Sequence, residues 1–245
     1  MCGRFTAAFD AQQFRNLTKL PAPPGWAARY NVAPETLIPI VRLNDQGRRE
    51  VIEARWGLVP SWVSEPADAR TLVNARSDSL EEKPSFSASF SRRRCLIPAD
   101  GFCEWMQGGK GAKPPVYFRF TRPLAMAGIW DLWSAPERRS RESVAIITTD
   151  ANTMVGHVHS RMPALLDAQA QTVWMNPSTP KKELLVLLKP SPEDFLRPYA
   201  VGNAVNNLRN DSRSLIERPS RKSKRLRPSI GNTVFTRLEQ PAQRV

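Results

Sequence analysis

The chain has 245 residues, 41% of them hydrophobic, and its seven Trp and ten Phe can fill a sizeable core. Its 36 Lys and Arg outnumber 23 Asp and Glu, and the net charge of +13 favours an anionic partner such as nucleic acid or a membrane surface. Three Cys do not fit a secreted disulfide scaffold, and no window approaches the ~20 apolar residues of a spanning helix. We therefore expect a soluble, cytoplasmic protein in a reducing compartment.

The chain begins Met1-Cys2-Gly3-Arg4-Phe5. Removal of Met1 would leave Cys2 with a thiol and a free α-amine, which together form a 1,2-aminothiol. Reference pKa values of roughly 7.7–8.0 for the amine and about 8.5 for the thiol make part of each group nucleophilic at neutral pH. The alternative interpretation is an ordinary Cys in a frayed terminus.

The first part of the chain predicts a helix over about 7–20 and a hairpin of strands 36–43 and 49–56. The loop that follows, 56–62, holds two Trp, which either stack bases or close a core. A strand over 72–76 puts Asn74 and Arg76 on one face, which suggests a ligand side. Next comes a helix over 79–92, interrupted at Pro84 and followed by three Arg at 92–94 that read as a solvated face.

Residues 95–105 predict a strand, a turn and a second strand, in which Phe102 and Glu104 share a face. Burial among apolar neighbours would disfavour the charged form of Glu104 and make it a general acid near neutral pH. The alternative is an edge-strand Glu facing water. Further strands over 116–120, 124–133 and 144–149 have the spacing of an antiparallel sheet, with helices over 168–176 and 181–188 and a last strand near 199–205.

The only two His of the chain, His157 and His159, lie in a short segment that ends in Pro163. Each is a candidate acid–base group because His alone has an ordinary pKa near working pH, although both could be structural. The sequence lacks the additional ligand spacing of a metal site, so we expect no metal and no other cofactor.

The composition changes near the end of the chain. Residues 217–245 contain eight Lys or Arg and two Glu, which leaves the rest of the chain basic as well. We expect one domain over 2–211 and a basic, disordered tail over 212–245, which either adds affinity for phosphates or serves solubility.

Seven stretches resemble, in order, the motifs of the SRAP family, the SOS response-associated peptidases. They are 1–5 (MCGRF), 30–34 (YNVAP), 55–62 (RWGLVPSW), 74–77 (NARS), 94–98 (RCLIP), 101–105 (GFCEW) and 159–163 (HSRMP). The resemblance implies a single α+β domain around a curved, antiparallel, barrel-like sheet with flanking helices. One departure is Cys103, where the family motif has an aromatic residue, and it bears on local packing and redox sensitivity more than on mechanism.

The same resemblance implies roles for individual residues. Cys2 would be the nucleophile, Asn74 and Glu104 its partners, and His159 an acid–base group. Three further Arg would contact DNA phosphates, Trp105 would border the DNA channel, and Thr148 is a weaker match; the three are Arg4, Arg76 and Arg161.

By this resemblance the protein would process abasic sites, trapping the ring-opened sugar in single-stranded DNA as a thiazolidine on Cys2. Lyase-like activity and self-cleavage of Met1 belong to the same expectation, as does association with the nucleoid in a bacterium. Other interpretations are an amidohydrolase with an N-terminal Cys, a non-catalytic single-strand-binding module and a peptidase acting on other proteins. We expect a monomer because no heptad run or long exposed apolar segment stands out.

Overall fold

The computed structural model describes residues 2–64, 71–106, 114–135 and 138–218. Within these residues the strands are β1 (Arg4–Ala7), β2 (Arg29–Val32), β3 (Leu37–Leu43), β4 (Arg49–Trp56), β5 (Asn74–Arg76), β6 (Arg94–Trp105), β7 (Pro115–Ala135), β8 (Arg138–Asp150), β9 (Arg161–Pro163), β10 (Leu165–Leu166) and β11 (Leu196–Ala200). The helices are α1 (Ala11–Thr18), α2 (Pro84–Arg92), α3 (Thr153–Gly156), α4 (Ala168–Met175) and α5 (Lys181–Leu187). Short 3-10 turns are η1 (Ser77–Ser79), η2 (Glu193–Phe195), η3 (Asn203–Asn206) and η4 (Arg213–Ile216).

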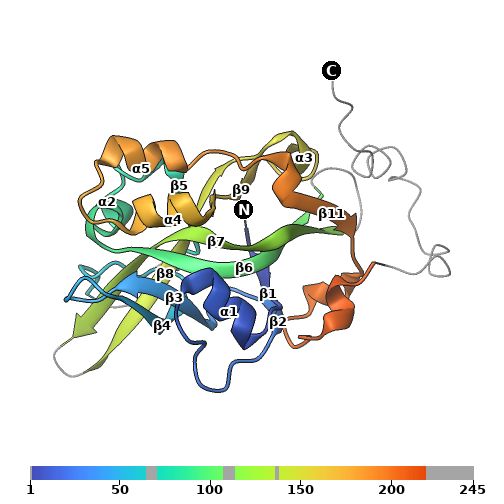
Figure 1. Cartoon of the computed structure of the whole chain (residues 1–245), viewed down its shortest axis with the longest axis horizontal. Helices are drawn as coiled ribbons and strands as arrows, with labels where there is room; N and C mark the ends of the chain where they lie inside the picture. The colour runs from blue at the N-terminus through green and yellow to red at the C-terminus, as the bar shows by residue number, and fades with distance from the viewer. Residues whose placement is uncertain (1, 65–70, 107–113, 136–137, 219–245) are drawn as a thin grey trace.

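The strands form one sheet that closes on itself. They follow the order β10-β7-β8-β4-β3-β6-β1-β2, and the additional pairing of β6 with β7 closes β7, β8, β4, β3 and β6 into a five-stranded barrel. Most pairs are antiparallel, and β8 also pairs in parallel with β4 and β5. The prediction of a single α+β domain around a barrel-like sheet is thereby confirmed (Figure 1).

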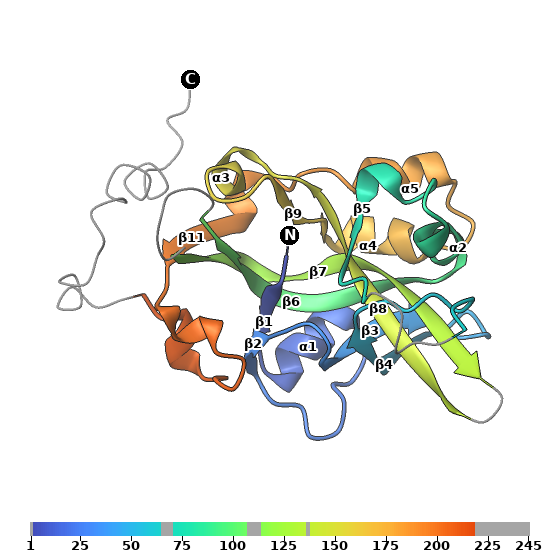
Figure 2. The ribbon, with the colours of Figure 1, turned by 180° about the vertical axis from the view of Figure 1, so that it is seen from behind.

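The helices flank the barrel on two sides. Figures 1 and 2 show α2, α4 and α5 gathered on one side of β6 and β7, and α1 on the other. The start of α1 is fixed by Asp10, whose carboxylate accepts the N–H of Gln13 at 2.7 Å in a capping box. Pro84 begins α2 instead of interrupting a longer helix, because the first turn does not need the N–H that Pro lacks.

The predicted strand, turn and strand over 95–105 is one continuous strand, β6. Both halves of β6 pair with the single long strand β7, and the register shifts between Ala99 and Gly101. A bulge therefore replaces the expected turn, because four residues of β7 (120–123) lie opposite one residue of β6 while the pairing continues on both sides. Gly101 fits because a Cβ there would lie 2.4 Å from the Tyr117 hydroxyl.

Arg94 corrects the interpretation of residues 92–94 as a solvated cluster. Its side chain is buried, and its guanidinium donates to the carbonyls of Phe90 and Ser91 at the end of α2 and of Trp174 and Asn176 at the end of α4. Carbonyls in the last turn of a helix have no partner within the helix. Arg94 therefore satisfies the ends of two helices at once.

The barrel interior holds an apolar cluster that reaches the start of the chain. Alternation along β6 and β7 directs Phe102, Phe118 and Phe120 into this cluster, and Cys2 and Trp56 belong to it as well. The described residues contain no helix long and apolar enough to cross a membrane. The expected disorder of the tail concerns mainly 219–245, which lies outside the described residues.

Candidate active site

Cys2 lies at the centre of the candidate site, fully buried against the apolar cluster. The side-chain amide of Asn74 donates to the Cys2 carbonyl oxygen at 3.0 Å. Burial raises the pKa of the Cys2 thiol far above its usual range, and the charge of Glu104 raises it further. In this environment the thiol is neutral at physiological pH, so a neighbouring base must take its proton when it reacts.

Glu104 is placed beside the start of the chain by the pairing of β1 with β6. Arg4 lies opposite Cys103 in that register, so the next residue of β6 lies beside the segment that leads to Cys2. Glu104 is 3% exposed, and burial raises its pKa from 4.5 to about 7. Near neutral pH the carboxyl group is thus divided between its protonated and ionised forms, as a group that both donates and accepts a proton must be.

Asn74 reaches the site from β5, which runs parallel to β8 with Asn74 beside Ile146. Its Nδ2 is used on the Cys2 carbonyl, whereas its buried Oδ1 has no hydrogen-bond partner among the described residues. A buried amide oxygen without a partner is costly unless a ligand or water supplies a donor. Asn74 can therefore accept a hydrogen bond from a substrate hydroxyl beside Cys2.

His159 follows α3 and precedes β9. The neighbouring Val155, Val158 and Met162 belong to the apolar cluster that contains Cys2, which brings this segment to the same region. The Arg161 N–H donates to His159 Nδ1 at 2.9 Å when the ring is neutral with its proton on Nε2, and the Arg161 carbonyl oxygen lies 3.2 Å from the same Nδ1. Burial lowers the pKa of His159, which favours this neutral form.

The predicted phosphate contacts Arg76 and Arg161 share one acidic neighbour, Asp78. Arg76 is exposed and meets the Asp78 carboxylate through Nε at 3.1 Å and Nη2 at 2.5 Å. Arg161 is 7% exposed and lies 3.5 Å from Asp78, and it also donates to Asp150 at 2.9 Å. A phosphate would have to compete with these carboxylates, and the exposed Arg76 is the more accessible of the two Arg.

Thr148 does not lie at the surface. Its side chain is fully buried, its Oγ1 has no hydrogen-bond partner among the described residues, and its carbonyl accepts from Arg161 at 2.6 Å. Any contact of Thr148 with a ligand would therefore take place inside the site and not with DNA phosphates along the protein surface.

Arg4 and Trp105 lie together at the edge of the barrel, under a segment that sequence reasoning did not assign to the site. We call residues 202–211 the C-terminal strap. Arg4 Nη1 donates to the Asn31 side chain at 2.8 Å and to the Val205 carbonyl at 2.7 Å, and the Trp105 indole donates to Asn206. Asn31 stands in the YNVAP motif, which was the available signal, whereas nothing in the sequence connected Asn206 with Trp105.

Cys103 points away from Glu104, as alternation along β6 requires. It is buried in a separate small cluster with Tyr117, Val201 and Val205, against which Trp105 also packs. The departure from the aromatic residue of the family motif is thus accommodated outside the barrel interior.

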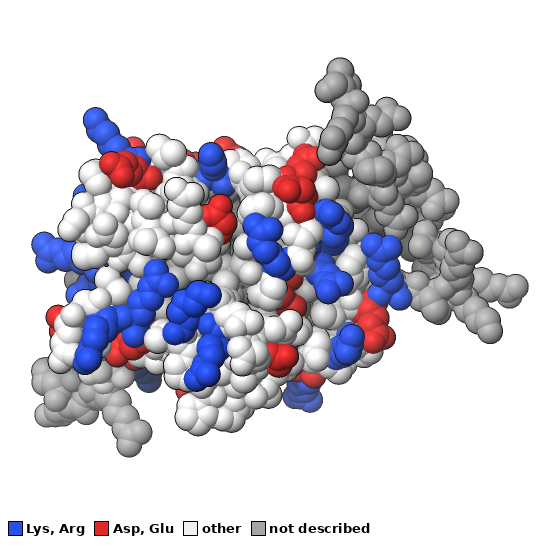
Figure 3. Space-filling view, viewed as in Figure 1, with Lys and Arg blue, Asp and Glu red and all other residues white. Residues whose placement is uncertain are grey.

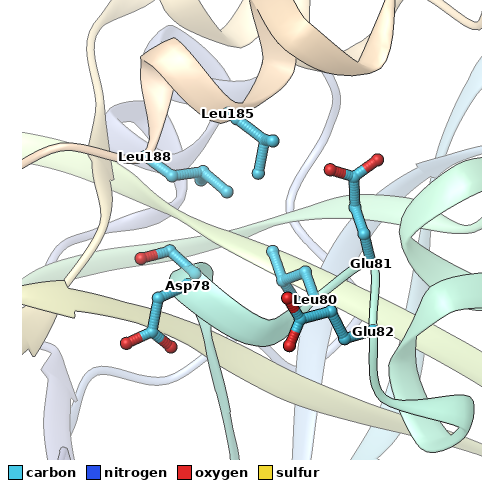
Figure 4. Close-up of a pocket in the computed structure, with 7 residues that line it drawn as sticks. Asp78, Leu80, Glu81, Glu82, Leu185 and Leu188 are labelled. Carbon is cyan, nitrogen blue, oxygen red and sulfur yellow. The ribbon is translucent and has the colours of Figure 1, made fainter.

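A pocket lies at the end of η1, and the carboxylates that line it argue against a DNA site there. Figure 4 shows Leu185 and Leu188 at the end of α5 facing Leu80, with Asp78 and Glu81 around them. Glu82 adds a third carboxylate, and three carboxylates would repel a phosphate backbone. The described residues also contain no group of three or more His, Cys, Asp or Glu arranged to hold a metal ion.

Residues 1–208 match the family described as SOS response associated peptidase (SRAP). The chain belongs to the SRAP family. It is 35% identical over 224 residues to the abasic site processing protein YoqW of Bacillus subtilis, covering 89% of this chain and 99% of YoqW. It is 32% identical over 249 residues to the abasic site processing protein HMCES of Mus musculus, covering 85% of this chain and 70% of HMCES.

Solved structures agree with this SRAP membership. A protein of Bacteroides thetaiotaomicron superposes with a TM-score of 0.78 at 28% identity, covering 89% of this chain and 100% of that one. A phage-related protein of Bordetella bronchiseptica superposes with a TM-score of 0.67 at 27% identity, covering 82% of this chain and 94% of that one. The family assignment drawn from the seven motifs is confirmed.

Proposed function

We propose that this SRAP protein captures abasic sites in single-stranded DNA by forming a covalent bond through Cys2. The names of its relatives support the substrate, and a net charge of +13 suits a phosphate backbone. Figure 3 shows Lys and Arg side chains spread over the face that it presents. The observation that carries the proposal is the convergence of Asn74 on the Cys2 carbonyl beside Glu104, whose pKa is about 7.

The reaction requires a free α-amine, so the Met1–Cys2 bond must first be hydrolysed. Met1 lies outside the described residues. Self-cleavage, which the word peptidase in the family description allows, and cleavage by an aminopeptidase give the same product. A variant that keeps Met1 would be inactive because an amide nitrogen is not a nucleophile.

The covalent steps conserve electrons and release one water. Protonated Glu104 gives its proton to the ring oxygen as its bond to the anomeric carbon breaks, and the anomeric hydroxyl gives its own proton to His159 as the aldehyde forms. The Cys2 amine adds to the aldehyde carbon and water leaves, forming an imine. The Cys2 sulfur then adds to the same carbon while its proton passes to the nitrogen, and a five-membered thiazolidine results. Loss of the imine suppresses the elimination that would cleave the strand, and with it the lyase-like side reaction.

The other site residues assist this sequence. Asn74 Oδ1 accepts from a sugar hydroxyl, and neutral His159 moves protons to and from the leaving water. Arg76 exchanges Asp78 for a phosphate of the DNA. Single strands are preferred because their lesion is already unstacked and does not need to be flipped out of a duplex.

Intact mass spectrometry tests the proposal. The protein is measured alone and after incubation with a single-stranded oligonucleotide that contains one abasic site. We expect a protein lacking Met1 and an adduct whose mass is that of protein plus DNA minus one water.

The matched controls are Cys2→Ala and an undamaged oligonucleotide, both of which should give no adduct. Wild-type protein that has lost Met1 and still forms no adduct with the abasic oligonucleotide would refute covalent capture. An adduct that persists in Cys2→Ala would show that the Cys2 thiol is not required for the bond, because the α-amine of residue 2 can still form an imine.

A further inference from the structure

The C-terminal strap is fastened to β2 independently of the candidate site. The Asn31 side-chain amide donates to three strap carbonyls, those of Val205 at 3.2 Å, Asn207 at 3.2 Å and Asn210 at 2.8 Å. The Asp211 carboxylate in turn accepts the backbone N–H groups of Tyr30 and Asn31. Figures 1 and 2 show this C-terminal part of the chain beside β2. The strap is thus a fixed part of the fold.

From this position the strap holds two residues that follow the catalytic candidates in sequence. Arg4 lies two residues after Cys2, and Trp105 lies one residue after Glu104. Arg4 donates to the Val205 carbonyl at 2.7 Å, and the Trp105 Nε1–H donates to the Asn206 Oδ1 at 2.8 Å. The Arg4 guanidinium lies 5.9 Å from the centre of the Trp105 ring, within range of a cation–π contact.

The hydrogen bond to Asn206 has a particular consequence for Trp105. Trp105 is only partly buried, so packing alone does not enclose its ring. Asn206 is exposed, and its side chain makes no other hydrogen bond among the described residues than the one with the Trp105 indole. An aromatic ring that is partly exposed, held at its polar edge and flanked by a cation is an arrangement on which a nucleobase stacks.

We propose that Asn206 is a positioning residue that holds the Trp105 ring as a stacking surface for a base of the bound single strand. This inference rests on the proposed function, because it takes DNA as the ligand of the edge beside Cys2 and Glu104. Asn206 itself does not touch the reacting atoms. Its contribution is to remove the rotational freedom that the ring would otherwise lose on binding.

The test is a double-mutant cycle on affinity for an undamaged single-stranded oligonucleotide. Asn206→Ala should weaken binding about fivefold, which is the ordinary contribution of one hydrogen bond. Trp105→Phe removes the donor and part of the ring, and the double variant should bind no more weakly than Trp105→Phe alone. The matched control is Asn207→Ala, because within the described part of the chain the Asn207 side chain bonds only to the Arg209 N–H, at 3.1 Å.

Two further measurements separate positioning from a general structural effect. At saturating abasic DNA the rate of adduct formation by Asn206→Ala should equal that of the wild type, so that only affinity changes. In ¹⁵N–¹H spectra the Trp105 indole signal, identified by its loss in Trp105→Phe, should move upfield in Asn206→Ala and stay in place in Asn207→Ala.

Additive losses in the cycle, an unshifted indole signal, or equal losses in Asn206→Ala and Asn207→Ala would each overturn the inference. Failure of the proposed function is seen separately, as the absence of an adduct from wild-type protein. The affinity cycle uses undamaged DNA and remains readable in that case.

Discussion

At the scale of single residues, the site places two groups that ionise with difficulty side by side. Burial keeps the Cys2 thiol neutral and raises the pKa of Glu104 to about 7, so Glu104 keeps its proton at mildly acidic pH. Neither group could be charged alone in an apolar cluster without a large penalty. A proton that passes between Glu104, the substrate and the Cys2 terminus avoids that penalty. Neither side chain then becomes charged before the substrate is bound, and the bound substrate supplies polar groups that stabilise the charge.

The raised pKa of Glu104 predicts a pH-dependent stability. Between pH 4.5 and about 7 the unfolded chain releases a proton that the native state retains, so the wild type loses stability as the pH rises. Relative to Glu104→Gln, the free energy of unfolding should fall by about 3 kcal/mol across this window and stay constant above it. Urea denaturation of both proteins at a series of pH values measures the difference, and a difference independent of pH would contradict the expected ionisation.

At the scale of elements, the site depends on how β1 and β6 are joined. The Thr6 hydroxyl donates to the Asp100 carboxylate at 2.6 Å and lies 2.8 Å from the Tyr117 hydroxyl, next to the bulge at Gly101. This buried network links β1, β6 and β7, and it fixes the register that brings Glu104 beside the start of the chain. A bulge next to a functional residue redirects the side chains that follow it.

Gly101→Ala should therefore destabilise the protein. The new Cβ would lie 2.4 Å from the Tyr117 hydroxyl and displace the ring from Thr6. We expect a loss of about 1–3 kcal/mol, the usual cost of overpacking. The matched control is Gly156→Ala, where nothing lies within 4 Å of the added methyl group. Equal midpoints of urea denaturation for the two variants would contradict the close contact that the structure predicts for a methyl group at position 101.

At the scale of the whole molecule, the charge is divided between the domain and the tail. Residues 219–245 hold seven Lys or Arg and one Glu, close to half of the net charge of +13. Each phosphate neutralised on a single strand contributes roughly −0.7 to the slope of log K against log salt. The salt dependence of DNA affinity can therefore separate the phosphate contacts made by the domain from those made by the tail.

Removal of residues 219–245 should lower affinity for single-stranded DNA and make the salt dependence shallower. Adduct formation at saturating abasic DNA should be unchanged, because Cys2, Asn74 and Glu104 all lie in the domain. Fluorescence anisotropy over a salt series measures the slope. The same slope for the truncated and full-length proteins would assign the tail to solubility instead.

Much of this protein could be predicted from local sequence signals. Asp10 and Gln13 form a capping box that starts α1, and the hairpin of β3 and β4 follows from alternating apolar residues around Asn44 and Gly47. Cys2, Asn74, Glu104 and His159 could be named because seven short motifs occur in a known order. These signals are local, since each needs only a few neighbouring residues.

Other features were decided only by the tertiary structure. The closure of the barrel depends on β3 pairing with β6 and β4 pairing with β8, a choice between distant strands that no local pattern encodes. The sequence predicts a solvated run of Arg at 92–94, whereas the structure brings two helix ends to Arg94. Nothing in the sequence connects Asn206 with Trp105, which the strap brings together. The residue types and the short motifs establish which groups can react. The long-range packing decided which of them are buried together, and burial sets their ionisation.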